Sequence, residues 1–194
     1  MLLRSTIPLS STLPSTLPSL RPLRQRGPLQ QRGPGAGPRS ISNQYSIADA
    51  DLASRGFDLR HSTAGLDIGH LNEVFVAVGF PRREPDRILT ALENTESLVW
   101  VEHRGSRRPV AFARATGDGV FNAVVWDVVV DPPFQGIGLG TAVVERLVAR
   151  LRRKGIANIA LYSEPRVMAF YRPIGFVADP DGIRGMVYST RKRR

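Results

Sequence analysis

A glycine-rich hexapeptide, Gln135-Gly-Ile-Gly-Leu-Gly140, is the strongest chemical signal in the sequence. It lies between a segment of strand character and the start of a predicted helix. Glycines leave backbone N–H groups uncovered, and with the first N–H groups of a helix they form a concave donor surface that suits a diphosphate. The motif therefore predicts a phosphate-binding loop formed by Gln135, Gly136, Ile137, Gly138, Leu139, Gly140 and Thr141.

Three alternative roles for these glycines fit the sequence less well. A P-loop needs a lysine after its last glycine, where this chain has Thr141. A Rossmann fingerprint needs a glycine at that same position, and only 54 residues follow Gly140 to complete a doubly wound sheet. A strand–turn–helix joint without a ligand accounts for one glycine but hardly three. The pattern that remains, Q-x-x-G-x-G, resembles loops that bind the pyrophosphate of acetyl-CoA.

Two carboxylates and one tyrosine are candidates for acid–base chemistry. Asp127 interrupts an apolar strand, in the run VVW-D-VVV, where an acid needs a polar partner or a chemical purpose. Glu164 stands just before a short predicted helix that carries Tyr171. Without a catalytic role, Asp127 would be a hydrogen-bonded structural residue, Glu164 a helix N-cap and Tyr171 a core aromatic.

Periodicity places these residues in a mixed α/β fold. Apolar residues recur at helical spacing in two early segments, and three segments of strand character follow, separated by glycine-containing turns that predict an antiparallel meander. The glycine-rich loop then opens a helix with an apolar residue at every fourth position. The expected helices are 66–78, 84–93, 138–154 and a short one from Pro165; the expected strands are 97–103, 109–116, 120–130 and 157–162, with strand-like pieces around Phe176 and at 186–189.

Composition removes several classes of chemistry. The 194 residues include no cysteine, which excludes disulfides, thiolate metal sites and a thioester on the enzyme. The three histidines lie far apart without the spacing of metal ligands, so we expect no metal. No run of 18 apolar residues occurs, and we expect no membrane span.

The net charge of +10 belongs to the two ends of the chain. Residues 1–48 contain six arginines and no acidic residue, and Arg191–Arg194 add four positive charges, so residues 49–190 are neutral overall. A neutral central part does not favour a nucleic-acid partner. The Pro-, Ser- and Arg-rich segment 1–46 has the composition of an organelle transit peptide, with a disordered extension or a nucleic-acid-binding arm as alternatives. We therefore expect a transit peptide at 1–46, one folded domain at 47–190 and a basic tail at 191–194.

Several of these motifs resemble one family. The stretch Val128-Val-Val-Asp-Pro-Pro-Phe-Gln-Gly-Ile-Gly-Leu-Gly140 resembles the acetyl-CoA signature of the GCN5-related N-acetyltransferase (GNAT) family. Phe170-Tyr-Arg-Pro-Ile-Gly-Phe176 resembles the short helix of that family, which ends in Y-x₃-G-F. More narrowly, residues 158–186 are similar to plastid acetyltransferases of plants and algae that include chloroplast serotonin N-acetyltransferase. Glu164 departs from the Asn that many family members have seven residues before the tyrosine, and agrees with the plastid subgroup.

The resemblance implies the GNAT fold, in which an antiparallel meander splays away from a βα unit, with acetyl-CoA as co-substrate and no metal. The pantetheine arm would pair with the backbone of Val128, Val129 and Val130 in the gap between two strands. The loop 135–141 would hold the pyrophosphate, and Asn158 would orient a water or the pantetheine amides. Tyr171 would contact the CoA and protonate its departing thiolate.

The implied reaction is direct acetyl transfer to an amine, which must lose a proton before it attacks. Either Asp127 or Glu164 could accept that proton, directly or through a water, and we expect burial to raise the pKa of the carboxylate that does so. The subgroup favours an arylalkylamine such as serotonin, in melatonin biosynthesis, as the acceptor. A protein N-terminus or lysine in the plastid is the alternative.

The resemblance also implies where the protein works and with what. The partners expected are a small-molecule amine or a protein amine, with no nucleic acid and no membrane, and a homodimer is compatible with this interpretation. The chloroplast is the expected compartment, and Arg191–Arg194 leave a nuclear pool open. From a different functional class, an interaction module that binds CoA without turnover is the alternative.

Overall fold

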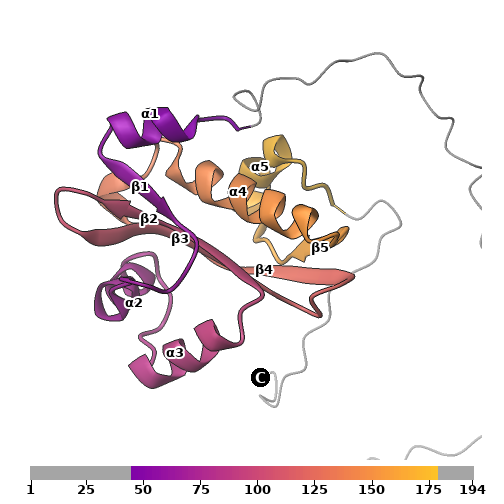
Figure 1. Ribbon diagram of the computed structural model, residues 1–194, viewed down its shortest axis with the longest axis horizontal. Helices are drawn as coiled ribbons and strands as arrows, with labels where there is room; N and C mark the ends of the chain where they lie inside the picture. Colours follow the sequence, from indigo (N-terminus) through magenta and orange to yellow (C-terminus); the bar gives the residue numbers. More distant parts are fainter. Residues whose placement is uncertain (1–44, 179–194) are drawn as a thin grey trace, which may run out of the picture. The chain divides into compact units, whose positions relative to one another are not determined.

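The computed structural model describes residues 45–178, which form one mixed sheet with helices on both faces (Figure 1). The five strands lie in the sheet in the same order as along the chain. Helices α1, α4 and α5 cover one face of the sheet, and α2 and α3 cover the other (Figure 1). The strands are β1 (Phe57–Arg60), β2 (Ser97–His103), β3 (Arg108–Gly117), β4 (Asn122–Val130) and β5 (Asn158–Leu161), and the helices are α1 (Asp49–Ser54), α2 (Ile68–Ala77), α3 (Pro85–Glu93), α4 (Leu139–Arg153) and α5 (Met168–Tyr171).

The predicted antiparallel meander is confirmed as β2, β3 and β4. Strand β1 pairs antiparallel with β2 at one edge, and β5 pairs parallel with β4 at the other. A parallel neighbour requires a crossover connection, which α4 provides. The α4 helix therefore connects the two strands between which the resemblance places the pantetheine arm.

Alternating side chains of the central strands form two separate cores. In β2, Val99 and Val101 belong to the cluster between the sheet and α4, whereas Leu98 and Trp100 belong to the cluster under α2 and α3. All four residues are buried. This near-continuous apolar run is what a strand covered on both faces needs.

The helix ends follow the expected local chemistry. The Asp67 carboxylate accepts a hydrogen bond from the His70 N–H at 2.9 Å and begins α2, and Pro85 stands in the first turn of α3. Arginines in the last turn of α4 suit the negative end of its dipole. The predicted bounds of these three helices agree with the structure within a few residues. No helix within residues 45–178 is long and apolar enough to cross a membrane.

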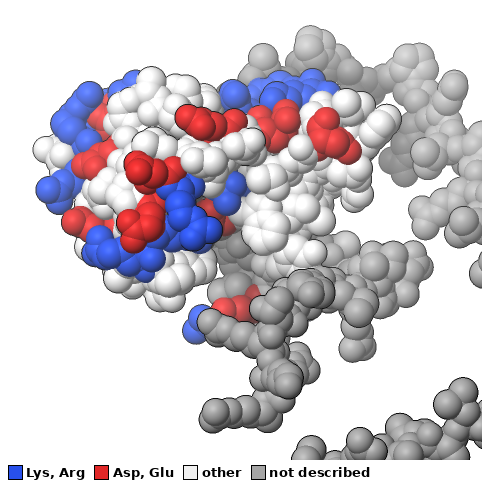
Figure 2. Space-filling view, turned by 90° about the horizontal axis from the view of Figure 1, so that it is seen from below, with Lys and Arg blue, Asp and Glu red and all other residues white. Residues whose placement is uncertain are grey.

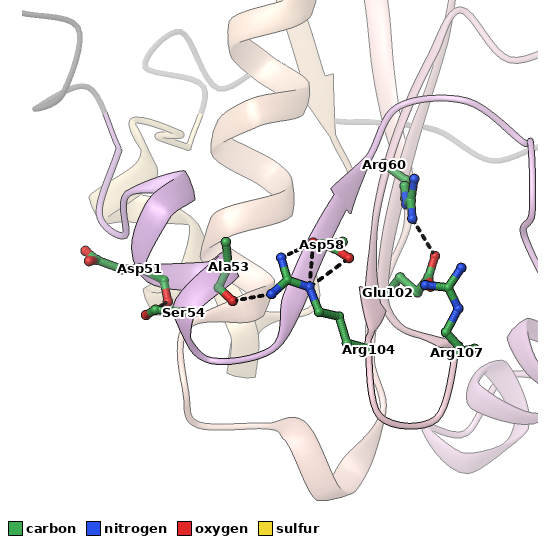
Figure 3. Close-up of polar contacts among 8 residues, drawn as sticks. All are labelled: Asp51, Ala53, Ser54, Asp58, Arg60, Glu102, Arg104 and Arg107. Carbon is green, nitrogen blue, oxygen red and sulfur yellow. Dashed lines mark hydrogen bonds and ion pairs between the residues drawn. The ribbon is translucent and has the colours of Figure 1, made fainter.

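The elements α1 and β1 were not predicted from the sequence. They have six and four residues, which is too short for a periodic signal. Arg104 ties them to the β2–β3 hairpin: its guanidinium donates to both oxygens of Asp58 at 2.7–3.0 Å and to the Ala53 carbonyl at 2.8 Å (Figure 3). Beside it, Glu102 forms an ion pair with Arg60, with 3.1 Å between the charged atoms (Figure 3).

One predicted strand is wrong. Phe176 lies in an irregular segment after Gly175, because its N–H donates to the Tyr171 carbonyl at 3.2 Å and its ring packs edge-on against the ring of Tyr171. The predicted piece at 186–189, the tail 191–194 and residues 1–44 of the predicted transit peptide lie outside the described residues.

Candidate functional site

A β-bulge in β4 sets the position of Asp127. Between the pairs Phe112–Val129 and Arg114–Trp126, β4 contains one more residue than β3, and Asp127 has a φ of 53°. An extra residue resets the alternation of side chains. Val125 and Val128 consequently both pack on the α4 side, although they are three residues apart. Because of the bulge, the Asp127 side chain does not point into the core beneath α4.

Asp127 lies on the α2/α3 side between two arginines. Its carboxylate accepts from Arg114 Nε at 2.6 Å and from Arg83 Nη2 at 2.9 Å, and its side chain is 9% exposed. Burial by itself raises the pKa of Asp127, but the hydrogen bonds and positive charges of Arg83 and Arg114 outweigh it and hold the pKa below its usual value. The expectation that burial gives this carboxylate a raised pKa is therefore wrong. Sequence reasoning missed both arginines, because neither lies near Asp127 in the chain.

A cleft of about 570 Å³ opens above Asp127 on the α2/α3 side. Its floor includes Phe112 and Arg114 of β3, and its walls come from α2, α3 and the connection between them, Pro81–Glu84. Figure 2 views this side of the molecule and shows basic side chains gathered there with acidic ones among them. The cleft reaches β4 one residue before Val128, so a molecule within it would approach the strand end that the resemblance assigns to pantetheine.

Strands β4 and β5 pair along only part of β4. The parallel ladder ends at the pair Val125–Leu161, whereas β4 continues to Val130. Within the described residues, Val129 and Val130 pair with β3, Val128 lies in the bulge, and none of the three pairs with β5, so the β5 side of their backbone carries no ladder. This is the arrangement that a pantetheine arm would need in order to add as a strand.

The glycine-rich loop has the backbone that its sequence predicts. Gly136 and Gly138 have φ values of 76° and 91°, a left-handed conformation that side chains other than glycine rarely adopt. Gly138 is the N-cap of α4, and the α4 N-terminus faces the loop. The side chain of Gln135 donates to the Val130 carbonyl at 3.0 Å and so fastens the loop to the end of β4. Arg55, which the sequence did not identify, donates to the Ile137 carbonyl at 3.2 Å.

Gly140 is where the strand end, the loop and the tyrosine-bearing helix meet. A Cβ at this position would lie 3.3 Å from Val130 Cγ2 and 3.3 Å from Phe170 Cζ. A larger residue at position 140 would press on these two side chains, so glycine favours close packing here and does not serve an unusual φ. The contact brings α5 against the first turn of α4, so Tyr171, the neighbour of Phe170, lies close to the same junction.

Tyr171 is half-buried and packs against the α4-side core, with its ring edge-on to Phe170 and Phe176. Burial raises the pKa of its phenol. The hydroxyl therefore stays protonated at neutral pH, which is the state that a proton donor requires.

The other two predicted residues are exposed. Glu164 is 64% exposed and pairs with Arg166 at 2.5 Å, so the burial expected for this carboxylate is wrong. It occupies the N-cap position of the turn that precedes α5 but makes no capping hydrogen bond with its side chain. Asn158 opens β5, and its side chain donates to Asn122 of β4 at 2.7 Å. The structure thus brings the loop, the valines and α5 together and leaves Glu164 apart from the Asp127 cleft.

An aromatic pair stands where the β4–β5 ladder ends. The rings of Trp126 and Tyr162 lie 5.6 Å apart between centroids, and the Trp126 indole N–H donates to Thr116 at 2.8 Å. Both side chains are exposed, by 38% and 61%. Trp126 precedes Asp127 directly, so the pair adjoins the bulge. Sequence reasoning did not single out either residue, although exposed aromatic residues at a strand end are a usable signal.

Comparisons with known proteins agree with this geometry. The family model described as "Acetyltransferase (GNAT) family" matches residues 67–176. The chain is 66% identical over 149 residues to "GCN5-related N-acetyltransferase 1, chloroplastic" of Arabidopsis thaliana, covering 77% of this chain and 76% of the relative. It is 64% identical over 149 residues to "Serotonin N-acetyltransferase 2, chloroplastic" of Oryza sativa subsp. japonica, covering 75% and 74%. A Glycine max protein named as a histone acetyltransferase is 39% identical over 136 residues, covering 66% and 59%.

Solved structures share the fold. A probable acetyltransferase of meticillin-resistant Staphylococcus aureus superposes with a TM-score of 0.60 at 15% identity, over 69% of this chain and 98% of that one. Glucosamine-6-phosphate N-acetyltransferase of Arabidopsis thaliana gives 0.56 at 21% identity, over 68% and 97%. The family match covers the meander, the loop and α5, which are the elements that build the site. The chain therefore belongs to the GNAT acetyltransferase family and is an N-acetyltransferase.

Proposed function

We propose that this protein transfers an acetyl group from acetyl-CoA directly to an arylalkylamine such as serotonin. The observation that carries the proposal is the junction at Gly140, where the end of β4, the glycine-rich loop and α5 pack together. It unites the expected pyrophosphate loop, the unpaired valine backbone and the proton donor in one place. Direct transfer also agrees with the absence of cysteine from the sequence.

The loop and β4 divide the binding of acetyl-CoA between them in this proposal. Backbone N–H groups at 136–141 would hold the pyrophosphate, and the β5 side of Val128–Val130 would hold the pantetheine arm. An N–H group of these valines would stabilise the oxyanion that forms on the thioester carbonyl. Tyr171 would then give its proton to the thiolate that leaves.

The acceptor would enter through the cleft on the α2/α3 side. Asp127 lies on the cleft floor, where Arg83 and Arg114 keep it ionised at neutral pH, so it is a weak proton acceptor. The amine would then lose its proton to water in the open cleft. Glu164 stays the alternative base, because it is exposed and lies after β5.

The aromatic pair favours an arylalkylamine. Trp126 and Tyr162 present exposed rings at the end of the β4–β5 ladder, where Trp126 directly precedes Asp127 in the chain, and aromatic faces bind an indole by offset stacking. The name of the Oryza sativa relative supports the same acceptor class. A protein N-terminus or lysine is the second candidate, favoured by a cleft that is open and rich in arginine.

A panel of acceptors tests the proposal. The full chain would be incubated with acetyl-CoA and, separately, with serotonin, tryptamine, a lysine peptide and a peptide with a free N-terminus, and products would be measured by mass spectrometry. We expect the two arylalkylamines to be acetylated fastest. Faster acetylation of either peptide would contradict the arylalkylamine proposal and favour a protein amine as the acceptor.

We also propose that the protein works in the chloroplast, since two relatives at 64–66% identity are named as chloroplastic. Segment 1–46 would direct import. A fluorescent protein fused behind residues 1–48 should enter plastids. Fluorescence confined to the nucleus would contradict this proposal.

A further inference from the structure

The acceptor cleft carries an unusual charge for this domain. Four guanidinium groups and two carboxylates line it, which leaves an excess of two positive charges, although residues 49–190 are neutral overall. A low-dielectric wall on one side makes such a charge more effective than on a convex surface. The excess is therefore a property of the cleft and not of the domain.

Half of this charge is fixed on the cleft floor. Arg83 and Arg114 share Asp127, and Arg83 is held further by stacking over the Phe75 ring at 4.6 Å. The backbone of Arg83 is also fixed, because its N–H and carbonyl both bond to the Asn72 side chain, at 3.1 and 2.7 Å. Two arginines with one carboxylate leave one net positive charge that cannot swing away.

The other half stands at the rim. Arg82 and Arg87 line the cleft, are exposed, and form no ion pair with any carboxylate of residues 45–178. Glu84 is the one acidic residue beside them in the lining. Arg83 and Arg114 on the floor are paired with Asp127, whereas Arg82 and Arg87 at the rim can bind a ligand.

We propose that Arg82 and Arg87 form a carboxylate-binding subsite, so that this protein prefers amines that carry a carboxylate to uncharged analogues of those amines. The proposal rests on acetyl transfer to an amine in this cleft. An acceptor arrives largely as an ammonium ion, which an excess of positive charge repels. A carboxylate on the same molecule removes that repulsion and gives the guanidinium groups a planar, two-oxygen partner.

The test uses acceptor pairs that differ only in this charge. The C-amidated peptides Ser-Glu-Glu-Tyr and Ser-Gln-Gln-Tyr compare a peptide source of the carboxylate, and tryptophan and tryptamine compare a small-molecule source. In at least one pair, we expect kcat/KM for the acceptor with the additional carboxylate to be about fivefold higher than kcat/KM for its partner. This ratio of the two kcat/KM values should fall as the salt concentration rises. The pair that shows the ratio identifies the source.

The double variant Arg82→Gln/Arg87→Gln should bring that ratio to about one, whereas Arg152→Gln, an exposed arginine on α4, should leave it unchanged. The same double variant should raise kcat/KM for serotonin, because it removes repulsion of a cationic amine. A damaged fold would lower kcat/KM for every acceptor, whereas loss of the positive charge should lower it for acceptors with a carboxylate and raise it for serotonin.

The outcomes are distinguishable from those of the proposed function. If no amine is acetylated, the proposed function fails. If serotonin or a peptide is acetylated but acidic and neutral partners react equally, or if the double variant slows every acceptor alike, the carboxylate subsite is wrong.

Discussion

Arg114 Nε lies 2.6 Å from Asp127 Oδ2, and this contact joins β3 to the bulge of β4 beneath the acceptor cleft. Arg83 occupies the other oxygen of Asp127 at 2.9 Å. The carboxylate thus joins the two strands to the connection between α2 and α3. It holds the floor of the cleft in place, and its removal should affect stability before it affects proton transfer.

Replacing Asp127 with Asn tests this structural role. Asn tolerates a positive φ, so the bulge should persist while the charge is lost and Arg114 stays largely buried without a counter-charge. We expect the free energy of unfolding to fall by about 2 kcal/mol in urea titration. Asp58→Asn is the matched control, because it removes the counter-charge of Arg104 at the exposed hairpin. An equal loss in both variants would contradict the special role of Asp127.

The pKa of Asp127 gives a pH dependence of stability. Because its folded pKa lies below the unfolded value of about 3.9, its ion pairs stabilise the protein above that pH and are lost as pH falls through the folded pKa. The stability difference between the wild type and Asp127→Asn should therefore be constant near neutral pH and shrink below about pH 4. A difference that grows towards acid would reverse this assignment.

The three loop glycines should respond differently to alanine. Gly136→Ala meets only backbone strain, about 1–2 kcal/mol, because no atom lies near its Cβ. Gly138→Ala adds a clash with the Ile47 side chain, and Gly140→Ala would press on Val130 and Phe170 without strain in φ. Calorimetry with acetyl-CoA should show the largest loss of affinity for Gly138→Ala. Normal affinity in that variant would place the pyrophosphate elsewhere.

Tyr171→Phe should lower kcat by at least about tenfold and leave the affinity for acetyl-CoA nearly unchanged, since only the proton donor is lost. Tyr162→Phe is the matched control, because it removes a hydroxyl from an exposed ring and keeps the ring. In the wild type, the alkaline fall in kcat that follows loss of the Tyr171 proton should begin only at strongly alkaline pH, because burial raises the pKa of Tyr171. A kcat within about twofold of wild type would remove the general-acid role.

The segment before α1 should be required for stability. The Arg146 guanidinium is buried, donates to the Ile47 carbonyl at 2.7 Å and to Asp49, and lies 4.3 Å from the Tyr45 ring centroid. A chain that begins at Asp49 should have a lower Tm than one that begins at Arg39. Equal Tm values would show that these contacts do not stabilise the domain. If the proposed transit peptide is removed on import, these contacts favour a cleavage site before Tyr45.

The long elements were predictable because each carries a local pattern. Strand β2 was predicted with its observed bounds, and α4 within one residue at each end, since their apolar periodicity extends over seven and fifteen residues. The loop was predictable because glycine itself reports the backbone that Gly136 and Gly138 adopt.

The rest depended on contacts between distant residues. Arg83 and Asp127 are 44 residues apart in the chain, and no local sequence pattern predicts which arginine pairs with a given carboxylate. The bulge could not be predicted either, because an extra residue in β4 can be recognised only when the register of β4 with β3 is known. These two features reversed the expected pKa shift of Asp127, whereas the expectation for Tyr171 rested on a motif and remains a prediction of its role.

Formation of N-acetylserotonin tests the central claim most directly. The full chain would be mixed with acetyl-labelled acetyl-CoA and serotonin, and labelled product and free CoA would be quantified together. The proposed function predicts labelled N-acetylserotonin and CoA in equal amounts, and a strongly reduced rate of both for Tyr171→Phe. CoA release without labelled product, or no reaction with serotonin while other amines are acetylated, would contradict it.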